Sequence, residues 1–419
     1  MNIEIKRDSY LNQLLVRRNN GLIKIITGLR RCGKSYLLRT IFKNHLLNEG
    51  VPHDHIIEMA FDLFENLEYQ DPKVFYPWIN EQIKDDGRYY ILLDEVQLLR
   101  EFVSVLNGLS EKKNCDVYVT GSNAKFLSKD IATEFGGRGD EVHMYPLSFA
   151  EFMTVYNGHY YDGFNEYMTY GGIPIVALAD TSEQKMALLE NLFSETYIRD
   201  IKTRNKLRNV GEMEALLNIL SSSIGSLTNP NKLCNTFHTV NQSKITATTI
   251  TKYIEYLYDS FLIEQAKRYD IKGKSYIGTP QKYYFTDLGL RNARIGYRQM
   301  EVTHSMENII YNELRIRGYK VDVGNLNITE QDKTKKFIKK QLEVDFICTS
   351  GSKKYYIQSA YLLETPEKIK QEIRPFLKIN DSFKKIVITS NTPKPFYTED
   401  GILMMNIYDF LRNNESLEL

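Results

Sequence analysis

Residues 28–35 read Gly-Leu-Arg-Arg-Cys-Gly-Lys-Ser, the complete G-x-x-x-x-G-K-S pattern of a phosphate-binding loop. The apolar residues at 22–26 lead into the loop as a buried strand would, and residues 36–38 continue from it as a helix. Glycine lets the backbone wrap closely around an oligophosphate, and the amides at a helix N-terminus attract its charge. This strand–loop–helix context predicts a parallel α/β sheet that binds a nucleoside triphosphate.

We expect the nucleotide to contact the loop and the residue that follows it, namely Gly28, Leu29, Arg30, Arg31, Cys32, Gly33, Lys34, Ser35 and Tyr36. Lys34 is expected to reach the β- and γ-phosphates, and the Ser35 hydroxyl is expected to ligate Mg²⁺. The expected cofactors are therefore ATP and Mg²⁺. The alternative is a chance glycine turn before a helix, and the complete motif in its context argues against it.

A second apolar run, residues 89–93, ends in Asp94 and Glu95. Uninterrupted apolar strands of this kind are typical of parallel sheets that helices cover on both faces. At the strand tip, Asp94 is expected to hold Mg²⁺ through water, and Glu95 is expected to polarise the attacking water. An Asp-Glu pair alone would be weak evidence, but one about sixty residues after a phosphate-binding loop is specific.

Two further segments are candidates for catalytic roles. A third strand, residues 116–120, leads into Gly-Ser-Asn, so Ser122 or Asn123 could sense the γ-phosphate at the carboxyl edge of the sheet. A simple turn is the alternative there. Arg138 lies among glycines and could stabilise charge on the transferred phosphoryl group, in its own site or in a neighbour's. A plain surface arginine is the other interpretation.

The segments ITGLRRCGKS, ILLDEVQLL, VYVTGSNAKFLS, GGRGDEVHMYPLSFAEF and YMTYGGIPIV together resemble predicted AAA+ ATPases of bacteria and archaea that carry a C-terminal domain of unknown function. The resemblance covers essentially the whole chain. It implies an AAA+-type core at 1–165 and a helical lid at 166–205, with a hinge at the Gly-Gly-Ile-Pro turn of residues 171–174. Arg199 and Asp200 match a family motif, either as a lid–core salt bridge or as a nucleotide contact.

The middle of the chain is basic. Residues 201–300 carry 15 Lys and Arg against 7 Asp and Glu, a net +8 in a chain whose total is +1. Helical spacing over 211–224, 231–239 and 244–258 is followed by strand-like pieces at 261–268 and 282–286. Three helices and a hairpin predict a winged helix within residues 206–300.

In such a module the third helix contacts DNA, so its early residues and the basic loop of the hairpin are the DNA-binding candidates. They are Lys244, Thr248, Lys252, Lys272 and Lys274, with Thr246, Thr249, Lys267 and Arg268 beside them. The third helix is expected to be capped at Ser243 or Thr246. Winged helices also serve as protein–protein modules, so duplex DNA and a protein partner both stay open.

Residues 301–419 resemble an α/β nuclease fold of the PD-(D/E)XK type. Glu307 and Asp345 match its two acidic positions, but Gln358-Ser359-Ala360 stands where an active enzyme has Glu/Gln-x-Lys. Hydrolysis at such a site needs carboxylates for Mg²⁺ and a lysine that positions water. Lys353 and Lys354 are too far along the strand to replace the missing lysine. The resemblance therefore implies a degenerate nuclease fold, with Glu307, Asp345 and Gln358 as its remnant site.

The bulk composition bounds the class of protein. At 419 residues the chain is longer than one core usually supports, so roughly two to four domains are expected. The four cysteines form no C-x-x-C pair, and no apolar run approaches ~18 residues, which predicts a cytoplasmic protein without a membrane span. Three functions stay open: an ATP-driven switch on DNA or a DNA-bound partner, a signalling ATPase with a protein partner, and a nucleotide-regulated endonuclease. A trans-acting Arg138 would require a homo-oligomer.

Overall fold

The structure is a computed structural model that describes residues 5–121, 137–207, 210–240, 244–298, 300–331 and 336–419. The chain divides into two compact units. The first comprises Met1–Pro146 with Asp259–Phe261, and the second comprises Leu147–Tyr258 with Leu262–Leu419.

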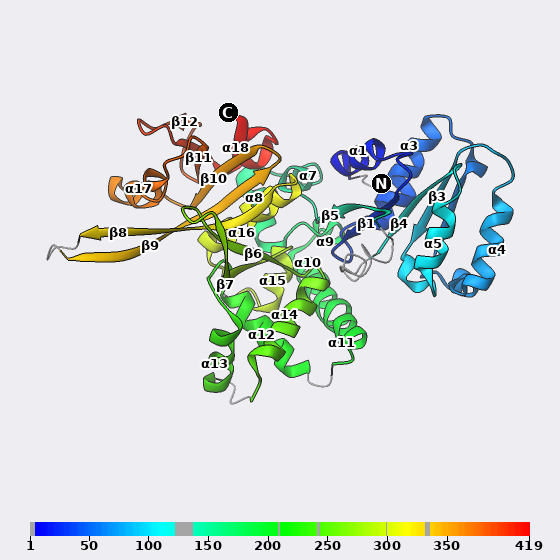
Figure 1. Cartoon of the computed structure of the whole chain (residues 1–419), viewed down its shortest axis with the longest axis horizontal. Helices are drawn as coiled ribbons and strands as arrows, with labels where there is room; N and C mark the ends of the chain where they lie inside the picture. The colour runs from blue at the N-terminus through cyan, green and yellow to red at the C-terminus, as the bar shows by residue number, and fades with distance from the viewer. Residues whose placement is uncertain (1–4, 122–136, 208–209, 241–243, 299, 332–335) are drawn as a thin grey trace. The chain divides into compact units, whose positions relative to one another are not determined.

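The first unit is built on a five-stranded sheet whose neighbouring strands all run parallel. Its order is β2-β3-β4-β1-β5 (Figure 1). The strands are β1 (Ile23–Gly28), β2 (Ile56–Ala60), β3 (Tyr89–Asp94), β4 (Cys115–Thr120) and β5 (Gly139–Met144). The three apolar runs that the sequence marks as strands are thus β1, β3 and β4. Because β4 lies between β1 and β3, the ends of these three strands form one continuous edge.

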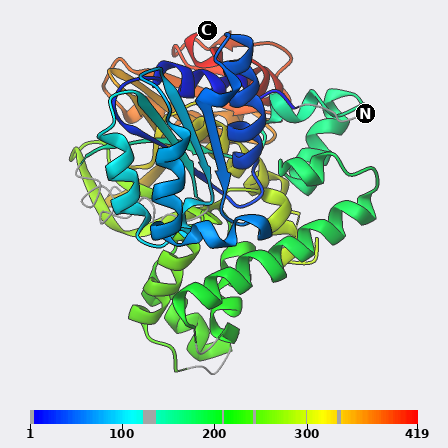
Figure 2. The same ribbon diagram turned by 90° about the vertical axis from the view of Figure 1, so that its right-hand side faces the viewer.

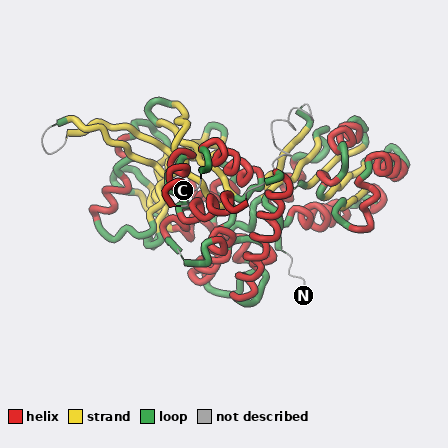
Figure 3. Tube along the Cα trace, turned by 90° about the horizontal axis from the view of Figure 1, so that it is seen from below, coloured by secondary structure: helices red, strands yellow, loops and turns green. Residues whose placement is uncertain are grey.

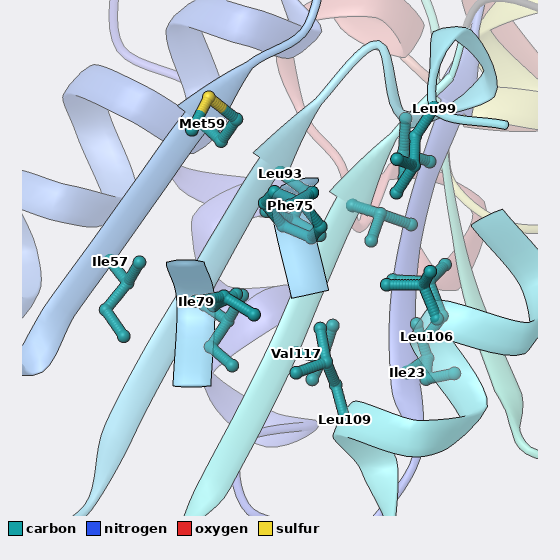
Figure 4. Close-up of a cluster of buried hydrophobic side chains, with 14 of the residues drawn as sticks. Ile23, Ile57, Met59, Phe75, Ile79, Leu93, Leu99, Leu106, Leu109 and Val117 are labelled. Carbon is teal, nitrogen blue, oxygen red and sulfur yellow. The ribbon is translucent and has the colours of Figure 1, made fainter. Parts of the chain in front are cut away.

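Helices of the first unit lie on both sides of this sheet (Figure 2). They are α1 (Asp8–Val16), α2 (Lys34–Tyr36), η1 (Leu37–Phe42), α3 (Lys43–Asn48), α4 (Pro72–Gln82) and α5 (Phe102–Ser110), with short turns η2 (His53–His55), η3 (Phe64–Gln70) and η4 (Val96–Leu98). On one side, Phe75 and Ile79 of α4 and Leu106 and Leu109 of α5 pack on the buried strand residues (Figure 4). Burying each such side chain contributes about 1.5–3 kcal/mol, which fixes the sheet edge that carries the loop.

The second unit begins with helices and contains further helices between and after its strands. They are α7 (Phe149–Met153), α8 (Tyr160–Tyr170), α9 (Pro174–Ala177), α10 (Ser182–Asn191), η6 (Leu192–Ile198), α11 (Arg199–Asn205), α12 (Val210–Ser222), α13 (Pro230–Val240), α14 (Ala247–Asp259), α15 (Leu288–Arg294), α16 (Val302–Ile316), α17 (Pro366–Ile373) and α18 (Ile407–Arg412), with η7 (Phe376–Lys378) and η8 (Ser416–Glu418). Helix α14 buries Ile250, Ile254 and Leu257 along one side, in agreement with the helical spacing that the sequence shows over 244–258. Thr246 caps this helix, because its Oγ1 accepts a hydrogen bond from the Thr249 amide at 3.2 Å.

The second sheet has eight strands in the order β12-β13-β11-β10-β9-β8-β6-β7. The strands are β6 (Ile263–Asp270), β7 (Ser275–Phe285), β8 (Lys320–Gln331), β9 (Phe337–Ser350), β10 (Lys353–Ala360), β11 (Lys384–Thr389), β12 (Phe396–Tyr397) and β13 (Leu403–Asn406). The predicted hairpin is β6–β7, and it joins the C-terminal strands because β6 pairs in parallel with β8. The predicted fold class, a parallel-sheet P-loop core with a further α/β sheet toward the C-terminus, is confirmed. The division into four domains stays a prediction.

The Gly-Gly-Ile-Pro turn that the resemblance marks as a hinge lies inside the second unit, where it is anchored. The Gly172 amide donates to Asp287 Oδ2 at 2.7 Å, and the Gly172 carbonyl accepts from the Leu147 amide at 2.7 Å. Gly171 has φ +74°, and a Cβ there would lie 2.2 Å from Asp287 Oδ1. The turn therefore packs against the N-terminus of α15 in this structure, and its role as a hinge stays a prediction.

Candidate functional site

The phosphate-binding loop connects β1 to α2 at the carboxyl edge of the first sheet. Gly28 has φ +137°, and a Cβ on it would lie 2.0 Å from the Met144 carbonyl oxygen of β5. Gly33, which precedes the helix, has φ +104°. Both conformations favour glycine, so these two positions of the motif let the loop turn tightly against its neighbouring strand. Leu29 and Cys32 are buried beneath the loop, whereas Arg30, Arg31, Ser35 and Tyr36 are exposed.

Lys34 lies within the loop, and its side chain is almost completely buried. Its Nζ donates hydrogen bonds to the Gly28 and Leu29 carbonyl oxygens, each at 3.0 Å. The ammonium therefore lies within the loop whose amides are expected to cradle the phosphates.

Asp94 ends β3 beside the start of α2. Its Oδ1 accepts hydrogen bonds from the Ser35 hydroxyl at 3.0 Å and from the Thr120 hydroxyl at 2.5 Å. Burial raises the pKa of Asp94, although the two hydroxyls oppose that shift. A buried carboxylate beside a serine hydroxyl is an oxygen donor set of the kind that Mg²⁺ prefers, so the residues present fit the ion. Ser35 and Asp94 would hold it.

Glu95 follows directly, in a strained backbone conformation with φ +51°. Its amide donates to Thr120 Oγ1 at 3.0 Å, and its carboxylate accepts a hydrogen bond from the Gln97 amide group. Thr120 therefore contacts both acidic residues from the neighbouring strand β4. No pattern in the sequence singles out Thr120 or Gln97, because their roles depend on the strand order.

Arg7 also supports the loop and was not predicted. Its guanidinium is buried and donates to the Cys32 carbonyl oxygen at 3.3 Å and to the Tyr145 carbonyl oxygen at 2.7 Å. It thereby ties the floor of the loop to the residue after β5. Ser122 and Asn123, the candidate γ-phosphate sensors, lie outside the described residues.

Arg138 precedes β5 and therefore lies at the amino ends of the parallel strands, whereas the loop lies at their carboxyl ends. In the parallel pairing of β1 with β5, Ile23 is opposite Gly139, and Gly28 is opposite Met144. Six residue steps of about 3.3 Å, or roughly 20 Å, therefore separate Arg138 from the strand end that carries the loop. The Arg138 guanidinium is 2.8 Å from the Glu111 carboxylate and half exposed. This placement argues against a role in the chain's own site.

The DNA-binding candidates of the basic middle lie at the surface. Lys244, Thr248 and Lys252 are exposed at the start of α14, and Lys272 and Lys274 are exposed in the turn between β6 and β7. Arg268 is different, because it is buried and donates a hydrogen bond to Asn325 Oδ1 at 2.8 Å. The expectation that Arg268 contacts a phosphate backbone is therefore wrong. The pairing of β6 with β8, which the sequence does not reveal, draws this arginine inward.

Three carboxylates meet in the second unit around a lysine that sequence reasoning missed. The Lys282 Nζ of β7 lies 2.8 Å from Glu307 Oε1 on α16, 2.8 Å from Glu343 Oε1 on β9 and 3.6 Å from Asp345 Oδ1. We call these four residues the carboxylate cluster. The Tyr284 hydroxyl also donates to Glu307, at 2.6 Å. The remnant acids Glu307 and Asp345 are thus brought together, and an ammonium does accompany them.

The charges of the cluster are strongly coupled. Burial would raise the pKa of the Glu307 carboxyl, but the Lys282 ammonium lowers it below its usual range. Burial and the neighbouring Glu307 charge raise the pKa of Asp345. Within the described residues, no group of three acidic, histidine or cysteine side chains is arranged to hold a metal ion.

The third nuclease position has a different environment. Gln358 Oε1 accepts from the Asp345 amide at 3.4 Å, but its Nε2 donates to Glu372 of α17 at 3.2 Å. Ala360 is buried in an apolar cluster with Tyr356 and Ile373. Lys353 and Lys354 lie near Glu418 and Asp381 respectively, as their distance along the strand predicts.

The parallel sheet, the phosphate-binding loop and the acids at the tip of β3 define a P-loop ATPase. Residues 20–153 match the family model described as an AAA domain, and residues 161–301 match a domain of unknown function, DUF8612. An uncharacterized protein of Haemophilus influenzae is 34% identical over 97% of this chain and 98% of its own length. The chain therefore belongs to this family of AAA-type ATPases that carry a C-terminal domain of unknown function.

Two more proteins are similar to this chain. The uncharacterized protein MJ1544 of Methanocaldococcus jannaschii is 27% identical and covers 90% of this chain and 83% of its own. The solved structure of the Walker-type ATPase PABY2304 of Pyrococcus abyssi is similar in fold, with a TM-score of 0.50 and 14% identity over 70% of this chain and 96% of its own. Among the residues that the structure describes, no helix combines the length and apolarity needed to cross a membrane.

Proposed function

We propose that the protein is an Mg²⁺-dependent AAA+-type switch that binds and hydrolyses ATP and acts on DNA or on a DNA-associated partner. The observation that carries the ATPase part is the contact of Ser35 and Thr120 with Asp94. It brings the loop, the metal-binding acid and the neighbouring strand to one point. Bound Mg²⁺ would neutralise charge on the phosphates. Lys34 supplies a second positive charge there, and Glu95 orients the attacking water as general base.

Two variants test this assignment. Lys34→Ala removes the expected β/γ-phosphate contact, so calorimetry should show strongly weakened binding of Mg·ATP. Glu95→Gln keeps the shape of the side chain but removes the base, so ATP should bind without turnover. Glu81→Gln, an exposed position on α4, is the matched control and should hydrolyse ATP at the parent rate. Parent-like turnover in Glu95→Gln would move the base elsewhere.

We place the Arg138 guanidinium in the site of a neighbouring copy, since it lies at the sheet edge opposite its own loop. Mixing Arg138→Ala with Lys34→Ala protein should then restore part of the ATPase activity, because one mixed interface keeps both groups. Arg88→Ala, another exposed arginine near this edge, should behave as the parent in the same mixture. Absence of recovery in proven mixed oligomers would leave Arg138 a structural residue.

The DNA part of the proposal is supported by the five exposed candidates on α14 and the β6–β7 turn, which fit a winged helix. Reversing the charges of Lys244, Lys252, Lys272 and Lys274 together should weaken binding to every duplex alike and flatten its dependence on salt. A protein partner is the second candidate, and the burial of Arg268 favours it by removing one cation from this surface. A parent protein that binds no DNA at low salt would support that candidate.

We propose no nuclease activity for the C-terminal region. The Lys282 ammonium lies within 2.8 Å of two carboxylates, so those oxygens are committed to an ion pair. Cleavage of plasmid DNA should be absent with Mg²⁺ or Mn²⁺. Metal-dependent nicking that disappears in Asp345→Ala would overturn this assignment.

A further inference from the structure

The β8–β9 hairpin continues past the strands beside it. Strand β6 pairs with β8 only over Val323–Asn325, and β10 pairs with β9 only over Phe346–Ser350. Residues 326–331 and 337–342, which we call the ribbon, pair with each other beyond those points in the described structure. Both Figure 1 and Figure 3 show the ribbon extending away from the rest of its sheet. Five residue steps of about 3.4 Å give it a length of roughly 17 Å.

The register of the ribbon sorts its side chains onto two faces. Directly paired residues share a face, and the pairs of one face, which we call the outer face, are Asn327 with Gln341, Thr329 with Lys339, and Gln331 with Phe337. All six of these residues are exposed, and Phe337 is 73% exposed.

The opposite face is already occupied. Ile328 is buried in the apolar cluster that includes Ile373 of α17. Glu330 binds the Arg374 guanidinium and lies 3.5 Å from the Lys340 ammonium. These contacts hold the ribbon to α17 and leave the outer face toward solvent.

The outer face is polar and carries one charge, the Lys339 ammonium, beside the exposed Phe337 ring. None of its six residues carries a carboxylate, although the chain as a whole holds nearly as many acids as bases. It presents amides, a hydroxyl and an ammonium, which are the groups that donate to and accept from base edges.

We propose that the outer face of the ribbon enters the major groove of duplex DNA. The groove, about 12 Å wide, admits a two-stranded ribbon and displays the hydrogen-bonding edges of all four base pairs. Asn327, Gln331 and Gln341 contact base edges, Lys339 contacts a guanine or a phosphate, and Phe337 contacts a thymine methyl. This proposal rests on the proposed action on DNA, and it adds a second DNA-contacting element that is separate from α14.

Two lysines on the same strand provide a matched pair for the test. Lys339 lies on the outer face, whereas Lys340 lies on the occupied face. With the full-length protein and a fluorescent duplex pool, Lys339→Ala and Gln341→Ala should each weaken binding, by roughly 5- to 150-fold on the sequences that the parent prefers. Lys340→Ala should bind as the parent does. Parent-like ATPase rates in all three variants would show that the fold is intact.

Chemical footprinting identifies the groove. Dimethyl sulfate methylates guanine N7 in the major groove, so the parent should protect guanines that the Lys339→Ala protein leaves reactive. If Lys339→Ala and Gln341→Ala bind like the parent while the four-lysine variant of α14 and its hairpin turn does not, the ribbon assignment is wrong and the proposed DNA function stands. A parent that binds no duplex overturns both. A self-association that Phe337→Ser abolishes, with DNA affinity unchanged, would assign the ribbon to a second copy of the chain instead.

Discussion

Replacing Lys282 by methionine tests whether the carboxylate cluster holds the second unit together. Methionine has a similar length and no charge, so the change removes the ammonium with little loss of volume. Three carboxylates then face one another without their cation, and two of them, Glu307 and Asp345, are buried. Breaking a buried ion pair by removing one partner costs about 3–5 kcal/mol.

The structure favours the lower end of that range. The pKa of Asp345 is already raised to about 7 by burial and by Glu307, so this carboxyl can take up a proton near neutral pH at little cost. A loss of about 3 kcal/mol corresponds to a melting temperature lower by roughly 6–12 °C for a large domain.

The pH dependence gives the sharper test. Without Lys282, the pKa of the Glu307 carboxyl in the folded state should rise above its unfolded value, since the ammonium is what lowers it. A carboxyl with a raised folded pKa stabilises the fold below its unfolded pKa and loses that contribution as pH rises through the folded pKa. The difference in stability between Lys282→Met and the parent should therefore become smaller as the pH falls from about 8 to about 5.

Differential scanning calorimetry of the full-length protein measures this effect. Lys353→Met is the matched control, because this exposed lysine of β10 pairs with the exposed Glu418; the variant should melt with the parent. The double variant Lys282→Met, Glu307→Gln should regain part of the loss, because it removes one of the uncompensated charges. A Lys282→Met protein that melts with the parent, or one whose deficit is the same at both pH values, would refute the reasoning.

Three further predictions concern other buried polar groups. Arg7→Met should weaken Mg·ATP binding by about tenfold in calorimetry, because a buried charged hydrogen bond is worth about 1.5–3 kcal/mol; Arg17→Met, which removes a partly exposed pair with Asp140, should not. Thr120→Val should slow steady-state ATP hydrolysis more than it weakens ATP binding, and Thr120→Ser should recover the rate, because the hydroxyl contacts Asp94 and the Glu95 amide. Burial raises the pKa of Asp287 to about 6, so the stability that this carboxyl contributes at low pH should fall between about pH 4 and 6; thermal melting of Asp287→Asn should lose that slope.

The sequence predicted the nucleotide site because its parts are local patterns. A phosphate-binding loop has fixed spacing, and buried parallel strands read as apolar runs, so β1, β3 and β4 with Lys34, Asp94 and Glu95 follow directly. Thr120 was visible as the end of a strand, but its contact with Asp94 depends on β4 lying between β1 and β3. Arg7 precedes the first strand and reaches the loop only through folding, so no pattern near the motif indicates it.

The carboxylate cluster of the C-terminal region was harder to predict, because its residues are brought together only by folding. The search for a missing lysine stayed within the strand of Gln358, since family motifs are read along the chain. The lysine that accompanies the acids is Lys282, which comes from a different strand and precedes Glu307 by 25 positions. Only the packing of β7 against α16 brings them together, and that packing is set by contacts such as the stacked rings of Tyr284 and Tyr311.

These contacts bear on whether the basic hairpin and the C-terminal fold are separate modules. Asn308 of α16 bonds both the amide and the carbonyl of Phe285 on β7, each at 2.8 Å. Strand β6 adds pairing with β8, and Lys282 adds a buried ion pair with α16 and β9. Hydrogen bonds, strand pairing and buried charge thus cross the same sequence boundary near residue 300. Because an unpaired buried charge is costly, separating the hairpin from α16 would leave the charges of the carboxylate cluster without their partners. The retained acids therefore have a structural explanation that needs no catalysis, since they fix the hairpin that carries Lys272 and Lys274 to the sheet that carries the ribbon.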